Sequence, residues 1–416
     1  MSPELISLGA LAVMFLVGTL LPINIGILAF VAAFVIGTAS LGLDEEQIFE
    51  GFPVSLFVTI VGVTYLFSIA QRNGTIDLIV SCGVRLVRGK VTLIPWVLFA
   101  VAAVLTAFGT FTPAAVALLV PIGMTIAFRH RMSPLMMGMM IICGGHAGAF
   151  SPIAVSGVLV NGMIADTSLH VPPSVLFLAS FGFNLLLSVA TFLLLRKKIQ
   201  PEPTDADTES TDDPAHSGIT WRQWLTLAAL GGLIVGALGF HLQIGFLALA
   251  AGALLALVDM KNQAKAVDGI SWSTILLVAG MVTYVGILEK AGTIDAISEH
   301  AALVGAPLLV ALLLCLTVAV TSAFASSTAI LTAIIPIAVP LLLSSHLSAA
   351  GLVAALAIST TIVDVSPFST NGALVLSNAK GVDRQRFYRQ VIGYTCAIVG
   401  LGPALAWGVL VLPGAF

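Results

Sequence analysis

The stretch Asp364-Val365-Ser366-Pro367-Phe368-Ser369-Thr370-Asn371-Gly372 interrupts a long apolar segment with residues that a lipid bilayer normally excludes. Asp364 is ionisable, Pro367 breaks an α-helix, and hydroxyl and amide side chains follow. A helix that breaks inside a membrane leaves backbone groups without partners, and such backbone is tolerated only inside protein or around a cavity. We therefore expect this stretch to lie at a functional site.

The composition is that of a polytopic membrane protein. Of the 416 residues, 58% are hydrophobic and only 9% are charged, whereas soluble domains carry about 25% charged residues. No basic patch lies on a soluble region, so we expect no nucleic-acid partner. The four cysteines are scattered without Cys-x-x-Cys pairs, which favours buried small apolar residues over disulfides or a metal site. We expect no bound cofactor.

The opening stretch has a counterpart in the first half of the chain. In residues 148–157, Ser151-Pro152 aligns with Ser366-Pro367, and Ser156-Gly157 aligns with Asn371-Gly372. Two matching broken helices in two halves of a membrane protein are the best sequence signal for a transporter's binding site.

Further matches at a nearly constant spacing indicate a duplication. They pair Ile25-Gly26 with Ile244-Gly245, Thr64-Tyr65 with Thr283-Tyr284, residues 74–77 with 292–295, and residues 108–112 with 324–328. The predicted fold is an all-α polytopic membrane protein with two inverted repeats of about five transmembrane helices, each with a re-entrant hairpin and a broken helix. If both limbs of a hairpin crossed the bilayer instead, each repeat would gain two crossings, and the second copy would still be inverted.

The predicted boundaries follow the composition. The first repeat covers residues 1–196, with its hairpin at 91–128 and its broken helix at 133–165. The second covers residues 222–416, with its hairpin at 303–343 and its broken helix at 348–379. Residues 197–221 form an acidic linker rich in Pro, Thr and Ser, which predicts disorder. Residues 75–90 are too charged to span and predict an interfacial helix.

The basic residues predict the orientation. With five spans per repeat, all of the 17 Lys and Arg residues except Lys290 lie on one face. The positive-inside rule makes that face, and the linker, cytoplasmic, with both termini outside. The N-terminus lacks the positive region of a signal peptide, so the first apolar segment is expected to be retained. We expect a multi-pass protein of the bacterial inner (plasma) membrane.

Two ionisable residues, His146 and Asp364, are expected near mid-membrane. A charge at the bilayer centre costs about 2.5–3.5 kcal/mol on insertion scales, so it rarely lacks a role. For both we predict cation or proton coupling. The alternatives are that Asp364 caps the half-helix after Pro367, and that a neutral His146 bonds a backbone carbonyl. The first copy has Ala149 where the second has Asp364, so the coupling ion is expected on the second half.

A set of small polar side chains at the two hairpin tips and the two helix breaks is the predicted substrate site. Its members are Thr110, Thr112, Ser151, Ser156, Ser326, Ser327, Thr328, Ser366, Thr370 and Asn371. A single membrane Ser or Thr often bonds its own helix backbone, so the prediction rests on the cluster. Half-helix N-termini there would each supply about half a positive charge. Since no Lys or Arg falls in a predicted span, an anion would be held by dipoles, hydroxyls, Asn371 and a co-transported cation.

Together these features resemble the ion-transporter superfamily, in particular the divalent-anion/sodium symporters and the malonate-type dicarboxylate carriers. Where the symporter tips carry Ser-Asn-Thr, this chain has Thr110-Phe111-Thr112 and Ser326-Ser327-Thr328. The breaks at Ser151-Pro152 and Ser366-Pro367 look more like those of the dicarboxylate carriers. The resemblance implies a homodimer whose hairpin-bearing domain moves against a scaffold as an elevator.

The function expected is secondary transport of small organic anions, foremost C3–C4 dicarboxylates, driven by Na+ or H+. The alternative is a cation/proton antiporter or a metalloid-anion exporter on the same fold, which would rely on His146 and Asp364 rather than on the hydroxyls. A membrane enzyme fits poorly, because the chain has no His-Glu-x-x-His motif and no hydrophilic domain. A channel is less favoured, because paired hairpins and breaks suit an occluded site better than a pore.

Overall fold

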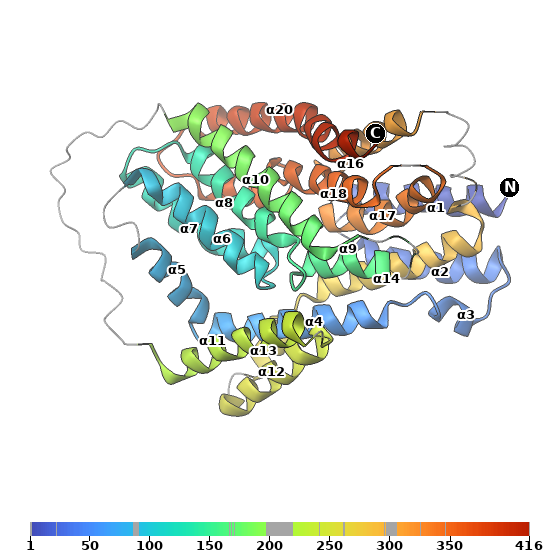
Figure 1. The fold of residues 1–416 in the computed structure, drawn as a ribbon, viewed down its shortest axis with the longest axis horizontal. Helices are drawn as coiled ribbons and strands as arrows, with labels where there is room; N and C mark the ends of the chain where they lie inside the picture. The colour runs from blue at the N-terminus through green and yellow to red at the C-terminus, as the bar shows by residue number, and fades with distance from the viewer. Residues whose placement is uncertain are drawn as a thin grey trace.

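The computed structural model describes residues 2–21, 23–85, 91–165, 167, 169, 171–196, 219–240, 242–260, 263–294, 296, 306–324, 326–345 and 347–415. Every regular element among these residues is a helix (Figure 1), which confirms the all-α class. Six helices in the described part are long and apolar enough to cross a membrane: Val54–Arg72, Thr112–Arg129, Pro173–Leu195, Trp272–Lys290, the interrupted Ala349–Asn378 and Arg384–Leu410. Most of the linker, residues 197–218, lies outside the described residues.

The described part of the first half contains ten α-helices and a short 3-10 turn. They are α1 (Pro3–Leu20), α2 (Ile25–Ala39), α3 (Glu45–Phe49), α4 (Val54–Arg72), α5 (Thr75–Arg85), η1 (Val91–Leu93), α6 (Ile94–Ala107), α7 (Thr112–Arg129), α8 (Pro134–Ala149), α9 (Val155–Ala165) and α10 (Pro173–Leu195). The short amphipathic α5 occupies the segment that was expected to be interfacial.

The described elements of the second half follow the same order. They are α11 (Trp221–Ile234), η3 (Val235–Gly239), α12 (Ile244–Val258), α13 (Gln263–Asp268), α14 (Trp272–Lys290), α16 (Pro307–Ser322), α17 (Ser327–Ser344), α18 (Ala349–Thr361), η5 (Ile362–Val365), α19 (Thr370–Asn378), α20 (Arg384–Leu410) and η6 (Leu412–Ala415). Residues 297–305, which precede α16, lie outside the described part.

Both Ser-Pro pairs interrupt a helix. Proline has no N–H to donate and clashes with the preceding turn, so α8 gives way to α9, and α18 gives way to η5 and α19. The chain doubles back tightly at each break. A Cβ added to Gly157 would lie 2.0 Å from the carbonyl oxygen of Ser151, and one added to Gly372 would lie 1.9 Å from that of Ser366. Only glycine fits these two positions.

Helices of one half pack against helices of the other. The backbones of α2 and α14 touch where Gly26 faces Gly280, because a Cβ on Gly280 would lie 2.0 Å from the carbonyl oxygen of Gly26. The backbones of α4 and α12 touch in the same way, where a Cβ on Gly62 would lie 2.5 Å from the carbonyl oxygen of Gly245. Small residues at such crossings allow the close approach typical of membrane helices.

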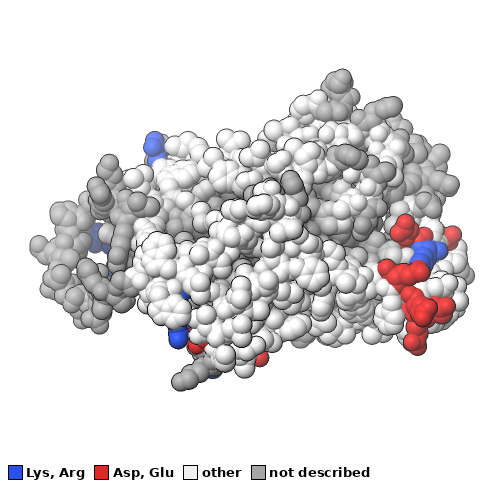
Figure 2. All heavy atoms as spheres, turned by 60° about the horizontal axis from the view of Figure 1, so that its bottom comes forward, with Lys and Arg blue, Asp and Glu red and all other residues white. Residues whose placement is uncertain are grey.

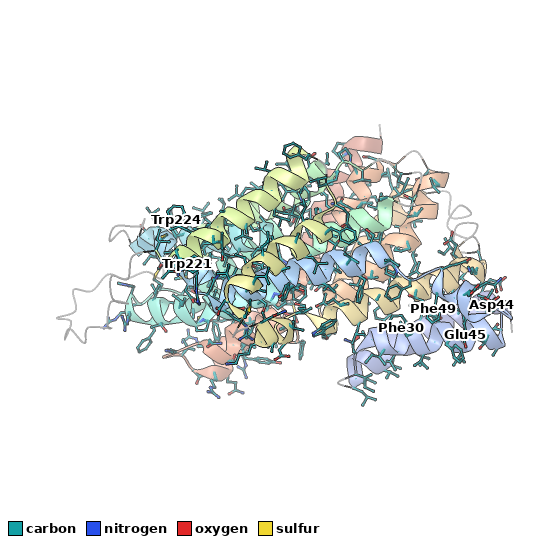
Figure 3. All side chains as sticks on the ribbon, turned by 90° about the horizontal axis from the view of Figure 1, so that it is seen from below. Phe30, Asp44, Glu45, Phe49, Trp221 and Trp224 are labelled. Carbon is teal, nitrogen blue, oxygen red and sulfur yellow. The ribbon has the colours of Figure 1, made fainter. Side chains whose placement is uncertain are left out.

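Charged side chains concentrate toward the two ends of the molecule. Figure 2 shows a broad uncharged band between them. At one end Lys290 forms an ion pair with Glu50, with 2.7 Å between Nζ and Oε2. Trp221 and Trp224 are exposed and lie at the opposite end from Asp44 and Glu45 (Figure 3). Exposed tryptophans beside an apolar band are typical of a membrane–water interface.

Candidate functional site

A polar cavity of about 230 Å³ lies where the helix breaks meet the turns between paired helices. It is large enough for a small solute, since one water occupies about 30 Å³ of liquid. Most of the residues predicted from the sequence line it, namely Thr112, Ser156, Ser326, Ser327, Thr328, Thr370 and Asn371, together with His146 and Asp364. These residues come from both halves of the chain, so the cavity is a joint product of the two.

Five helix N-termini of the described structure meet at this cavity. The helices α7, α9, α14, α17 and α19 begin at Thr112, Val155, Trp272, Ser327 and Thr370, and residues of the first turn of each line the cavity. The first N–H groups of a helix have no partner within the helix, and the helix dipole makes this end positive. The cavity is therefore suited to negative charge, although no Lys or Arg is among the described residues that line it.

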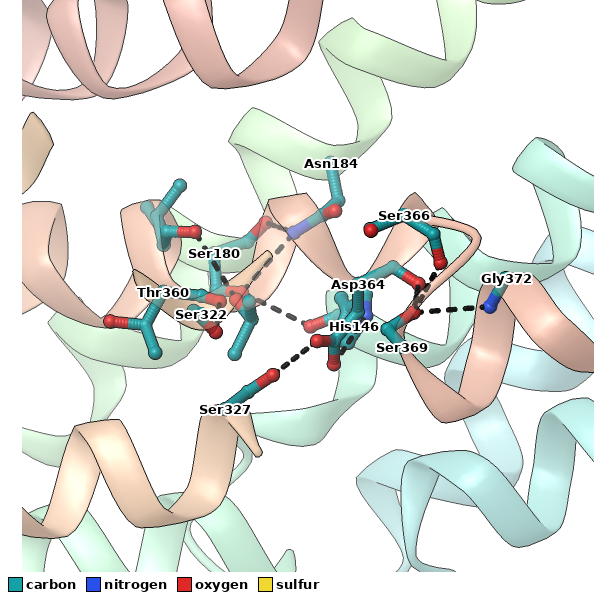
Figure 4. Close-up of polar contacts among 12 residues, drawn as sticks. His146, Ser180, Asn184, Ser322, Ser327, Thr360, Asp364, Ser366, Ser369 and Gly372 are labelled. Atoms are coloured by element: carbon teal, nitrogen blue, oxygen red, sulfur yellow. Dashed lines mark hydrogen bonds and ion pairs between the residues drawn. The ribbon is translucent and has the colours of Figure 1, made fainter. Parts of the chain in front are cut away.

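Asp364 and His146 lie side by side in the cavity wall. Nε2 of His146 is 3.6 Å from Oδ2 of Asp364, with side-chain exposures of 3% and 14% (Figure 4). The hydroxyl of Ser327 donates a hydrogen bond to Oδ1 of the same carboxylate. Ser327 is the first residue of α17, so Asp364 links the turn before α17 to the break after α18. The carboxylate of η5 thus joins the helix break to the N-terminus of α17.

The alternative roles weighed for these two residues do not match the structure. Asp364 does not cap α19, because the N-cap is Ser369, whose hydroxyl accepts a hydrogen bond from the N–H of Gly372 at 3.2 Å. His146 does not bond a backbone carbonyl through its ring. Neither of its ring nitrogens has a hydrogen-bond partner within the described structure. Its own carbonyl instead accepts from the Ser180 hydroxyl at 3.1 Å.

Asn371 presents an unpartnered amide to the cavity. The side chain is buried, with 1% relative exposure, and its Oδ1 atom makes no hydrogen bond in the described part of the chain. A buried polar atom without a partner carries a desolvation cost of about 1–3 kcal/mol. A ligand that hydrogen-bonds this amide would remove that cost.

Three of the predicted substrate residues lie outside the cavity lining. Ser151 and Ser366 stabilise the breaks instead. The Ser366 hydroxyl donates to the carbonyl of Ala323 at 2.7 Å and accepts from the N–H of Phe368 at 3.2 Å. The Ser151 hydroxyl accepts a long hydrogen bond from the N–H of Ile153, at 3.5 Å. Thr110 sits before α7 with its Oγ1 buried and unpartnered within the described residues.

Several lining residues were not expected from the sequence. Ser273, Thr274 and Leu277, at the start of α14, form one wall. Ser273 is positioned by Asn24, whose Nδ2 donates to its carbonyl at 2.8 Å and lies 3.0 Å from its Oγ. The sequence signal that could have identified Ser273 and Thr274 is that these hydroxyl residues lie together at the start of an apolar segment. Thr361 and Ser369, which flank Asp364 along the chain, also line the cavity.

The two halves contribute differently to the site. In the alignment of the two copies, Phe111 corresponds to Ser327 and Ala149 to Asp364. The second half therefore has a hydrogen-bonded hydroxyl and carboxylate where the first half has two apolar side chains. The ionisable partner from the first half, His146, comes from one turn earlier on its helix.

An all-helical chain with several membrane-length helices and a polar cavity between helix breaks has the architecture of a multi-pass membrane carrier. Residues 1–149 match the family model of the dicarboxylate carrier protein MatC N-terminus. The expected resemblance to malonate-type dicarboxylate carriers is confirmed over these residues, which run from α1 to the end of α8. The match supports a carrier rather than an enzyme. Comparison with curated proteins gave no match.

Proposed function

We propose that this protein is a secondary active transporter of small organic anions, foremost C3–C4 dicarboxylates. The observation that carries the proposal is the cavity at which five helix N-termini and the amide of Asn371 converge. Such a site attracts carboxylates without a fixed Lys or Arg, so the anion can also leave. The match of residues 1–149 to a dicarboxylate carrier family supports the same substrate class.

The proposed architecture is a pair of inverted repeats, residues 1–196 and 222–416, each with a re-entrant hairpin and a broken helix. The α6–α7 and α16–α17 pairs are the proposed hairpins. The reciprocal packing of α2 on α14 and of α12 on α4 supports a two-fold relation between the halves. Under this proposal those four helices belong to a scaffold, and the hairpins and broken helices move past it as an elevator in a homodimer.

The coupling ion is proposed to be Na+ or H+, bound on the second half at Asp364 with His146 beside it. The carboxylate is the ionisable acid among the described lining residues, and its position next to the N-terminus of α17, in the proposed second hairpin, supports this assignment. An ion bound there would change the electrostatics of the site at the point where the substrate is held.

The proposed membrane is the bacterial inner membrane, with both termini outside and the linker in the cytoplasm. Thiol labelling of a variant without the exposed Cys82 and Cys396 tests this orientation. Lys290→Cys should react with an impermeant reagent added to intact cells, and Arg389→Cys only after permeabilisation. The reverse pattern would invert the topology.

Uptake by proteoliposomes tests the transport proposal. Labelled malonate, succinate or malate should accumulate under an imposed sodium or proton gradient, and unlabelled dicarboxylate should compete. Absence of gradient-dependent uptake of every carboxylate would rule the proposal out. Empty liposomes, and liposomes with heat-denatured protein, provide the background.

A cation/proton antiporter or metalloid-anion exporter on the same fold is the second candidate. The proximity of His146 to Asp364 favours it, because such a pair can exchange a proton for a cation. Proton flux on addition of sodium to dicarboxylate-free proteoliposomes would support this second function over the first.

A further inference from the structure

The charges around the cavity do not suit every anion equally. Several helix N-termini bring partial positive charge to the cavity, while α8 and α18 bring their C-terminal ends to the same wall through His146 and Thr361. When Asp364 is ionised, its negative charge in the wall opposes a dianion more strongly than a monoanion. When Asp364 carries a proton, this repulsion is absent. The charge of Asp364 therefore ties the binding of a dianion to its protonation.

Two residues of the cavity wall have polar atoms that are available to a ligand. The Oδ1 atom of Asn371 and both ring nitrogens of His146 lack hydrogen-bond partners in the described structure, at residue exposures of 1% and 2%. Both residues line the same cavity as the helix N-termini. In Figure 4 the imidazole lies beside the Asp364 carboxylate, at a distance of 3.6 Å that is too long for a hydrogen bond but short enough for the charge of one group to affect the other.

We infer that the site binds a dianion together with one proton, which the Asp364 carboxylate takes up beside His146. This inference rests on the proposed transport of organic anions and specifies its coupling. One proton enters from water on the loading side and binds at Oδ2 of Asp364. The same proton leaves on the opposite side with the substrate, and no covalent bond of the substrate changes. Each dianion therefore moves with one proton through this pair.

The surroundings of Asp364 leave His146 as its titratable partner. On α20, the Tyr394 hydroxyl is engaged with Oγ1 of Thr191 at 2.7 Å. On α16 and α8, Cys315 and Cys143 are buried and do not line the cavity. The described parts of α17, α18 and α19 place hydroxyl and amide groups, but no ionisable side chain, in the lining.

The contacts of the carboxylate favour a proton over a metal cation. Hard cations require several oxygen ligands in one coordination sphere. Here Oδ1 of Asp364 accepts from the Ser327 hydroxyl, and Oδ2 faces an imidazole nitrogen. A proton needs only the pair of atoms that is already present.

Equilibrium binding of labelled succinate to the purified full-length protein in sodium-free buffer tests the inference. The pH range is chosen so that both carboxyl groups of succinate stay ionised. At pH values at which Asp364 is ionised in the ligand-free protein, each binding event takes up one proton. The affinity should therefore fall by up to about tenfold for each unit of rising pH. Asp364→Asn is neutral at every pH, and its affinity should be flat over the same range.

Asp383→Asn is the matched control. Asp383 is an exposed N-cap of α20 outside the cavity, and asparagine caps equally well, so this variant should keep the wild-type slope. Proton uptake on addition of succinate to the wild-type protein, followed with a pH indicator, gives a second reading that needs no variant. It should approach one proton per bound dianion.

The outcomes separate the inference from the proposed function. If the wild type binds no dicarboxylate at any pH, the proposed function fails and the inference fails with it. If it binds succinate with no pH slope, or if Asp364→Asn keeps the wild-type slope, only the proton coupling is overturned. Binding that requires sodium at every pH would also overturn it.

Discussion

Nε2 of His146 lies 3.6 Å from Oδ2 of Asp364, although the two residues belong to different halves of the chain. His146 is buried and Asp364 is mostly enclosed, so removing one leaves the other polar group without its neighbour. This relationship joins α8 of the first half to η5 of the second, within the wall of the cavity.

The His146–Asp364 contact should produce non-additive effects on stability. His146→Ala or Asp364→Ala alone leaves a buried partner uncompensated. The double variant should therefore lose less melting temperature than the two single losses added together, with a coupling of about 0.5–3 kcal/mol. Thermal unfolding of the detergent-purified proteins measures this. The pair His146→Ala and Asp383→Ala is the control and should be additive. Additive losses for His146 and Asp364 would mean that their proximity has no energetic consequence.

Asn371→Ala should abolish transport without harming the fold. The Oδ1 atom of Asn371 has no hydrogen-bond partner within the described residues, so its loss costs the free protein little. An ionised carboxylate only accepts hydrogen bonds, so the Nδ2 group of Asn371 is the one that would donate to it. A hydrogen bond to a charged ligand is worth about 1.5–3 kcal/mol, so the variant should bind dicarboxylate roughly 10- to 150-fold more weakly. Binding and melting temperature are measured on the same preparation. Asn378→Ala, at the far end of α19 and outside the cavity lining, is the control. An Asn371 variant that melts early but binds normally would contradict this role.

Gly372→Ala should destabilise the protein through the second helix break. An added Cβ would lie 1.9 Å from the carbonyl oxygen of Ser366. Backbone cannot move as easily as a side chain, so we expect a cost of about 1–3 kcal/mol. Gly157→Ala should behave alike, with 2.0 Å to the carbonyl oxygen of Ser151. Gly393→Ala in α20 meets nothing within 4 Å and should leave the melting temperature unchanged or slightly raised. Equal melting temperatures for all three variants would contradict the prediction that the backbone at the two breaks has no room for a Cβ atom.

Gly26→Ala and Gly280→Ala should both separate α2 from α14. The Cβ of the first would lie 2.1 Å from the carbonyl oxygen of Leu276, and that of the second 2.0 Å from the carbonyl oxygen of Gly26. Because both open the same crossing, the double variant should cost less than the sum of the singles. Fluorescence-detected size-exclusion profiles after heating give the melting temperatures. Gly231→Ala in α11 has no atom within 4 Å and is the matched control. A double variant as costly as the summed singles would place the two effects at separate sites.

The membrane class and the positions of the breaks follow from the sequence alone. A chain with 58% hydrophobic and 9% charged residues cannot remain soluble as a set of ordinary domains. Proline disfavours a continuous helix, and the helices are interrupted at Pro152 and Pro367, whereas Pro121 and Pro403 lie inside α7 and α20. The sequence signal was therefore the polar Ser-Pro motif and its repetition in the two halves, not proline alone. The convergence of the turns and the breaks on one cavity could also be predicted, because the polar motifs of the two halves match in order and spacing.

The roles of individual side chains were decided by tertiary packing. Ser366 and Ser151 were predicted to contact substrate, yet their hydroxyls hydrogen-bond backbone at the breaks. The local sequence does not show whether a serine hydroxyl hydrogen-bonds the backbone or a ligand, because a serine in a membrane helix can do either. The cap of α19 is Ser369 and not Asp364, because η5 carries the carboxylate away from the helix start and toward α17.

The sequence by itself indicated an all-helical membrane protein with two helix breaks and two ionisable residues within apolar segments. Only the tertiary structure decided that these two residues meet and that Ser273 and Thr274 of α14 complete the cavity. The physical reason is that breaks and spans arise from local backbone chemistry and hydropathy. The His146–Asp364 contact instead depends on how α8 packs against η5, which is set by close packing among helices far apart in the chain.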